Sequence, residues 1–332
     1  MNDKTKTKLK ELFDRREISL MALLIVLLIP ITIRSPSFLS GNNLGIIFND
    51  MAILVIVSIG QFFVILSNGI DLSVGSIIAF TGMACGMINE SHQAFPAAFL
   101  LFVGIGIGLL MGFFNGALVA FGKIPPMLAT LGTMSIYRGL TFVLSGGTWV
   151  TAHEMSPEYI ALPRLHFLGI TSLIWIAIIV IAVMYYITNY TQAGRGIYAI
   201  GGNPVAARFV GVSERKTRII TFLLSGALCG LAGALWTARY ASAVNEMATG
   251  FEMQTVAACV LGGVNFSGGA GGIIGVVVGA LFLGVIKNAL PVIYLSTFWQ
   301  TFVEGLVVLF ALSINTVIDH KKQRALLAQR RR

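Results

Sequence analysis

The sequence predicts an all-α membrane protein: a polytopic bundle of about ten transmembrane helices, some short or broken, with both termini cytoplasmic. Three observations predict this fold class. The chain has 332 residues, of which 56% are hydrophobic and only 11% charged, whereas soluble domains carry about 25% charged residues. Its apolar runs are roughly 20 residues long, the length that crosses a bilayer core. Its Lys and Arg residues gather in a few polar segments, as in an oriented membrane protein.

The chain begins with a charged leader, residues 1–17, followed by an apolar run at 18–33. The stretch after this run, "RSPSFLSGNN", contains no convincing small-residue cleavage site of the kind that ends a signal peptide. We therefore expect residues 18–33 to be a retained first span. The later apolar runs predict the other spans, at 44–67, 72–90, 96–121, 127–145, 167–189, 218–240, 251–264, 271–290 and 298–317.

The run at 251–264 is too short to cross the bilayer comfortably as a straight helix. Two interpretations are open for it. It is either a short crossing segment or one half of a re-entrant pair with the run at 271–290.

Positive charge predicts the orientation. The leader carries six Lys or Arg residues, the segment 191–218 carries five, the tail "HKKQRALLAQRRR" carries six, and Lys123 marks a further short loop. With ten passes that begin inside, these 18 of the 23 cationic residues fall on one face. Lys and Arg mark the cytoplasmic side, so we place both termini there.

The predicted organisation is a leader at 1–17, one transmembrane domain at 18–318 and a basic cytoplasmic tail at 319–332. Within the domain, residues 191–217 form a cytoplasmic segment. The formal net charge of +9 is explained by this one-sided distribution. Nucleic acid is therefore not expected as a partner, whereas membrane lipid is.

Glycines recur every fourth residue along three predicted helices. Such stripes let helix backbones approach closely in lipid, where no hydrophobic force drives helices together. They favour packing between helices of one subunit, and a contact between two subunits is the alternative. The stripes are Gly104, Gly108, Gly112 and Gly116; Gly271, Gly275 and Gly279; and Gly226 and Gly230.

Polar residues inside the apolar runs are candidates for lining a path for a hydroxylated solute, because such residues are costly at membrane depth. The stretch "SNGIDLSVGS" (67–76) carries no Lys or Arg. It either breaks the helices inside the membrane or forms a tight turn in which Asp71 or Ser73 caps the next helix. For Asn49, Asp50, Gln61 and Asn115, hydrogen bonding between helices is the alternative role. The candidates are Asn49, Asp50, Gln61, Asn68, Asp71, Ser73 and Asn115.

No sequence pattern for catalysis or cofactor binding stands out. The glycine-rich stretch at 261–275 lacks the Gly-Lys-Ser/Thr of a nucleotide-binding loop and joins two membrane runs. Cys85, Cys229 and Cys259 lie far apart in apolar runs, without metal-ligand spacing. We therefore expect no ATP site, no metal site and no enzyme activity in this chain.

Five stretches follow one another along the chain: "NGIDLSVGS", "KIPPMLATLGT" with "YRG" after it, "GRGIYAIGGNPVAARFVGV", "CGLAGAL" and "AACVLGGVNFSGGAGGIIG". In this order they resemble the permease subunits of bacterial sugar ABC importers. The resemblance is to the ribose, xylose and rhamnose permease group, and the chain is also similar to the autoinducer permease of that group. It covers about residues 20–318. Asn68 departs from the pattern, since many relatives have Gly there.

The resemblance implies a subunit of the bacterial inner membrane that works with several partners. Two permease subunits, as a homodimer or a heterodimer, form the pathway. An extracytoplasmic sugar-binding protein delivers the solute. A cytoplasmic ABC ATPase binds ATP and Mg²⁺ and drives transport.

The resemblance also implies a role for the basic segment after residue 190, otherwise a solvated loop, as the helix that docks on the ATPase. Asn203 can cap a short helix and Pro204 suits its first turn. Arg208 can grip an ATPase carboxylate. The proposed coupling residues are Gly201, Gly202, Asn203, Pro204, Ala206, Ala207, Arg208 and Gly211.

The solute is expected to be a monosaccharide such as a ribose-like pentose. A furanosyl quorum-sensing autoinducer is the alternative. An ion-coupled secondary transporter, the hypothesis from another class, would use buried carboxylates and often shows inverted repeats. The acidic residues here are few and scattered, and no clear internal repeat is visible.

Overall fold

The computed structural model describes residues 16–292 and positions 299, 302, 305, 306 and 309. Most of the leader, most of the predicted span 298–317 and the tail 319–332 lie outside the described residues. Each of the other nine predicted spans lies on one helix. The elements, in chain order, are α2 (Arg16–Arg34), η1 (Pro36–Leu39), α3 (Gly41–Leu66), α4 (Val74–Ser91), α5 (Ala97–Ala120), α6 (Pro126–Ser145), α7 (Pro157–Ala161), η2 (Leu162–Arg164), β1 (His166–Phe167), β2 (Ile170–Thr171), α8 (Ser172–Tyr190), α9 (Gln192–Gly202), α10 (Pro204–Phe209), α11 (Glu214–Tyr240), α12 (Phe251–Leu261) and α13 (Ile273–Val292).

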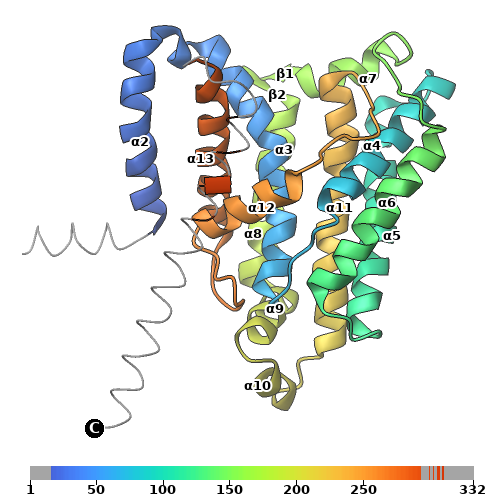
Figure 1. Cartoon of the computed structure of the whole chain (residues 1–332), viewed down its shortest axis with the longest axis vertical. Helices are drawn as coiled ribbons and strands as arrows, with labels where there is room; N and C mark the ends of the chain where they lie inside the picture. The colour runs from blue at the N-terminus through green and yellow to red at the C-terminus, as the bar shows by residue number, and fades with distance from the viewer. Residues whose placement is uncertain (1–15, 293–298, 300–301, 303–304, 307–308, 310–332) are drawn as a thin grey trace, which may run out of the picture.

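The long helices stand side by side, with α9 and α10 at one end of the bundle and α7 and the β1–β2 hairpin at the other (Figure 1). These ends are called the α10 end and the hairpin end below. Six helices in the described part are long and apolar enough to cross a membrane: α3, α5, α6, α8, α11 and most of α13.

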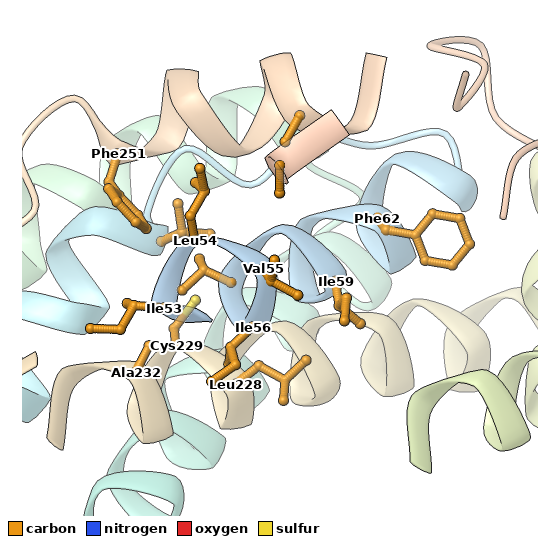
Figure 2. Close-up of a cluster of buried hydrophobic side chains, with 14 of the residues drawn as sticks. Ile53, Leu54, Val55, Ile56, Ile59, Phe62, Leu228, Cys229, Ala232 and Phe251 are labelled. Carbon is orange, nitrogen blue, oxygen red and sulfur yellow. The ribbon is translucent and has the colours of Figure 1, made fainter. Parts of the chain in front are cut away.

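α3 is the central helix. Its most apolar window is 94% buried, against 22–28% for α5, α6 and α8, so α3 is surrounded by protein while the other three also face outward. Figure 2 shows Ile53, Leu54 and Ile56 of α3 packed close to Cys229 and Leu228 of α11. The sequence of α3 is apolar on every side, as expected for a fully enclosed helix.

The glycine stripes pack helices of this one chain together. A Cβ on Gly108 of α5 would overlap the carbonyl oxygen of Gly226 on α11, and one on Gly104 would lie 2.6 Å from the Gly230 carbonyl oxygen. Gly275 of α13 meets Gly262 at the end of α12 in the same way. The expected packing within one subunit is therefore confirmed for these glycines.

Two crossings of the bundle are interrupted. Residues 67–73 are non-helical between α3 and α4, and residues 241–250 are non-helical between α11 and α12. Figure 1 shows the chain leaving α11 at the hairpin end and entering α12 within the bundle. The run predicted at 251–264 is thus an 11-residue helix followed by a turn, and that turn leads into α13.

We expect Gly108→Val to destabilise the protein by about 1–3 kcal/mol, because the new side chain has no room against the α11 backbone. Gly106→Val is the matched control, since nothing lies within 4 Å of a Cβ there and the intrinsic helix cost is the same. Thermal unfolding of the detergent-solubilised variants would measure the difference. Equal melting temperatures for the two variants would contradict the close-packed seam.

Candidate functional site

The break between α3 and α4 is built around Asp71, which is fully buried. Its Oδ1 accepts hydrogen bonds from the Ser73 backbone N–H (3.0 Å) and the Ser73 hydroxyl (2.6 Å). Its Oδ2 accepts one from the Ser225 hydroxyl of α11 at 3.0 Å. A buried carboxylate needs such donors, because burying it without hydrogen bonds is very costly.

Neighbouring side chains also satisfy the backbone of the break. Thr130 of α6 donates to the Ile70 carbonyl and accepts from the Leu72 N–H, both at 3.1 Å. Gln61 of α3, in the amide orientation that satisfies both groups, donates to the Asp71 carbonyl at 3.0 Å and accepts from the Asp71 N–H at 3.2 Å. Three helices therefore fix this segment: α3, α6 and α11.

The network extends to α5 through Asn115, whose amide donates to the Ser73 hydroxyl at 2.8 Å and accepts from the Tyr137 hydroxyl at 3.0 Å. Ser73 occupies the N-cap position of α4, but its side chain does not cap the helix; the hydroxyl bonds Asp71 instead. The segment is thus a non-helical turn within the bundle, and the predicted side-chain cap of α4 by Asp71 or Ser73 is not formed. We call this set the Asp71 cluster: Gln61, Asp71, Ser73, Asn115, Thr130, Tyr137 and Ser225.

The seven predicted pathway residues lie in three places. Gln61, Asp71, Ser73 and Asn115 bond one another in the Asp71 cluster. Asn49 and Asp50 lie on α3 toward the hairpin end; Asn49 accepts from the Thr171 hydroxyl at 2.6 Å, and Asp50 pairs with Arg239 at 3.2 Å. Asn68 lies at the α10 end, with a φ of 62°. All seven were predicted to line one path because they lie in or beside apolar runs. The fold places them in three separate locations.

The segment expected as a cytoplasmic loop contains two helices, α9 and α10, which we call the platform. Asn203 caps α10 as predicted: its Oδ1 accepts from the N–H groups of Val205 and Ala206, both at 3.0 Å, and Pro204 is the first helical residue. Gly211 follows with a φ of 81°, a conformation that favours glycine. Ala207 is buried, whereas Ala206 is exposed.

The outer surface of α10 is apolar with one cation. Phe209 is 88% exposed and Val210 is 78% exposed. Arg208 lies 3.8 Å from Glu214, and both side chains are partly open to solvent, so this ion pair holds the guanidinium only weakly. An exposed apolar tip of this kind is typical of a surface that meets another protein.

The platform contacts the end of α3 and the turn before α13. Gly201 packs against the Leu66 carbonyl at the end of α3, and the same carbonyl accepts from the Gly269 N–H at 2.9 Å. Gly202 lies against Gly269 as well. Glycine is required at position 201 because a Cβ there would overlap the Leu66 carbonyl.

Two longer side chains reinforce this junction. Arg218 donates to the Ser67 carbonyl at 3.2 Å. Tyr198 donates to the Gly271 carbonyl at 2.7 Å, and burial raises the pKa of its phenol. Sequence analysis did not identify Arg218 or Tyr198, because nothing in their spacing points to partners more than 70 residues away.

At the hairpin end, Arg138 of α6 holds the non-helical segment 241–250. Its guanidinium donates to the carbonyls of Asn245 and Met247, both at 2.9 Å. Ser145 donates to the Asn245 side chain at 2.7 Å. This second break is therefore fixed by α6, as the first one is.

Comparison with known proteins decides the family. Residues 43–312 match the family described as "Branched-chain amino acid transport system / permease component". The chain belongs to this permease family. It is 37% identical over 304 residues to the Autoinducer 2 import system permease protein LsrC of Shigella flexneri, covering 92% of this chain and 88% of that protein. It is 34% identical over 322 residues to LsrC of Salmonella typhi, covering 97% and 92%. No solved structure matches the chain significantly.

The permease is thus the membrane subunit of an ABC importer of the sugar type and a multi-pass protein of the inner membrane. Members of this family are transport subunits and not ATPases. Permeases of such importers work with an ATPase and with a substrate-binding protein.

We expect Ser225→Ala to destabilise the permease by about 1–3 kcal/mol, because the Asp71 carboxylate loses a hydrogen bond in a buried site. Ser58→Ala is the matched control. Ser58 is equally buried, and its hydroxyl has no hydrogen-bond partner among the described residues, so its removal should be close to neutral. Unfolding in detergent would compare the two. A Ser58→Ala effect as large as that of Ser225→Ala would contradict the role of the Asp71 cluster.

Proposed function

We propose that this permease forms part of the pathway by which an ATP-driven importer carries a small furanosyl signal molecule of the autoinducer-2 type into the cell. The observation that carries the proposal is the 34–37% identity to autoinducer 2 import permeases over more than nine-tenths of the chain. A ribose-like pentose is the second candidate, favoured by the ordered stretches shared with the ribose, xylose and rhamnose permeases. Both solutes are small, neutral and rich in hydroxyl groups.

We propose that two permease subunits pair around the pathway, as a homodimer or a heterodimer, with the α10 end in the cytoplasm. The basic residues of the 191–218 segment support this orientation, because positive charge marks the cytoplasmic side. ATP and Mg²⁺ are bound by the partner ATPase. The absence of a nucleotide-binding pattern in the sequence supports this assignment.

The platform is the proposed contact with the ATPase. Phe209 and Val210 offer an apolar tip to a groove of the partner, and Arg208 offers a charge-assisted hydrogen bond to a carboxylate. A hollow of about 710 Å³ lies beside α10, lined by Lys123, Arg208, Arg215 and Arg218 together with Glu214 and apolar residues. Its excess of cations suits an acidic segment of the ATPase.

The platform also supplies a route for movement. Gly201 and Gly202 of α9 touch the end of α3 and the turn before α13, and Arg218 of α11 donates to the Ser67 carbonyl beside them. A displacement of α10 by the ATPase would therefore reach the central helix through direct backbone contacts.

We expect Phe209→Ser and Arg208→Glu each to lower co-purification of the ATPase several-fold, because an apolar anchor or a charge pair at an interface is worth about 1–3 kcal/mol. Leu168→Ser is the control: Leu168 is 76% exposed and lies in the hairpin at the opposite end. Membrane insertion should be unchanged in all three. Undiminished association in both platform variants would remove α10 from the docking role.

The solute can be tested in cells that lack their own uptake systems and express the complete importer. We expect autoinducer 2 to disappear from the medium at least several-fold faster than in cells without the permease, with ribose a poor competitor. Uptake of ribose in preference to autoinducer 2 would favour the second candidate instead.

A further inference from the structure

A cavity of about 240 Å³ lies between α3, α11, α12 and α13. Its residues on α11, Trp236 and Tyr240, are in the last turns of that helix, at the hairpin end. Those on α13, Lys287 and Asn288, are likewise near that helix's end. The cavity is therefore in the half of the bundle that faces away from the platform.

One wall of this cavity is aromatic. The ring of Trp236 lies 5.2 Å from that of Phe251 in an edge-on arrangement and 5.3 Å from that of Tyr240. Figure 2 shows Phe251 at the edge of the buried cluster, beside Leu54. Flat aromatic faces of this kind suit the C–H faces of a sugar ring, which are apolar although the ring carries hydroxyls.

The rest of the lining is polar. Asp50 and Asn288 border the cavity, and they offer a carboxylate and an amide that can accept from and donate to hydroxyls. Gln254 also lines it. Asp50 meets Arg239 and the Tyr240 hydroxyl through Oδ1 alone. Its Oδ2 accepts no hydrogen bond from the described residues.

The charges around the cavity do not select a cation. Among the described residues, Asp50 and Lys287 line it, and Arg239 already pairs with Asp50 at 3.2 Å. A neutral occupant is taken from the import function proposed above. The volume is below the roughly 300–1,000 Å³ typical of sites for drug-sized ligands. A single small ring fits it better than a disaccharide.

The position of the cavity matches a feature known from secondary transporters. Their solute sites are typically formed where a membrane helix is discontinuous. Phe251 and Gln254 belong to the first turn of α12, the half-helix that follows the break at 241–250. Toward the platform, α3 continues into the buried residues Val55, Ile56 and Ile59, which are not part of the cavity lining.

We propose that this cavity is a binding site for one neutral, hydroxylated sugar-like ring on its way through the permease. Trp236 and Phe251 cover a face of the ring, and Asp50 and Asn288 bind its hydroxyls. The proposal rests on the import function proposed above and adds the residues and the solute class. It also gives a role to the Oδ2 of Asp50, which accepts no hydrogen bond from the described residues.

The test uses the complete importer in proteoliposomes, with its binding protein and ATPase, and autoinducer 2 and ribose as probes. We expect Asn288→Ala and Trp236→Leu each to lower uptake per ATP hydrolysed by about fivefold or more, the equivalent of one lost hydrogen bond or ring contact. The ATPase rate and subunit assembly should not change. Asn189→Ala is the control, because Asn189 makes the same amide bond to a carbonyl four residues back as Asn288 does, but on α8 and outside the cavity.

A second readout does not depend on turnover. In an Asn288→Cys variant, a small water-soluble thiol reagent should label residue 288, and the probe that is transported should slow the labelling. The native cysteines are buried and give little background. Unchanged coupling in both cavity variants together with unprotected labelling would overturn the cavity site while leaving the import function standing. If the wild-type importer takes up neither probe, both proposals fail.

Discussion

The structure depends on one constraint: irregular backbone inside a membrane protein must find its hydrogen bonds within the protein, because lipid offers none. Two crossings are broken, at 67–73 and 241–250. In the first, the side chains of Gln61, Thr130 and Asp71 bond backbone N–H and C=O groups that the break leaves without helical partners. In the second, Arg138 binds two carbonyls. Since α6 supplies Thr130 and Arg138, this one helix holds both breaks.

Three parts of the bundle have different proposed roles: the α5–α11 seam, the platform and the solute cavity. The seam of α5 with α11, closed by glycines on both helices, has no room for side chains and so forms a rigid unit. Around it, Gly201 and Gly202 of the platform pack closely against the end of α3 and the turn before α13. The proposed solute cavity lies at the other end of the same helices. The helices α3 and α13 would therefore connect a force applied at α10 to a solute bound near Asp50.

Local patterns in the sequence were sufficient to predict most of the helices and several of their contacts. Apolar run length predicted nine of the described helices, six of which are long and apolar enough to cross a membrane. Glycine spacing predicted the close seams, and the Asn-Pro step predicted the cap of α10. Contacts between distant segments could not be predicted. The buried network that joins Asp71 to Asn115 through Ser73 is one such contact. Another is the aromatic wall of the cavity: Trp236 and Phe251 look like ordinary apolar residues in the sequence, and only the fold places them beside Asp50. The tenth predicted span and the tail lie outside the described residues and stay predictions.

The central claim is that ATP hydrolysis in a partner drives solute through this permease. The most direct measurement is uptake of labelled autoinducer 2 into proteoliposomes that hold the purified permease, ATPase and binding protein, with ATP supplied on the ATPase side. The account predicts uptake that needs ATP, the ATPase and the binding protein together, and that does not respond to a proton or sodium gradient. Uptake by the permease alone, driven by an ion gradient, would contradict it.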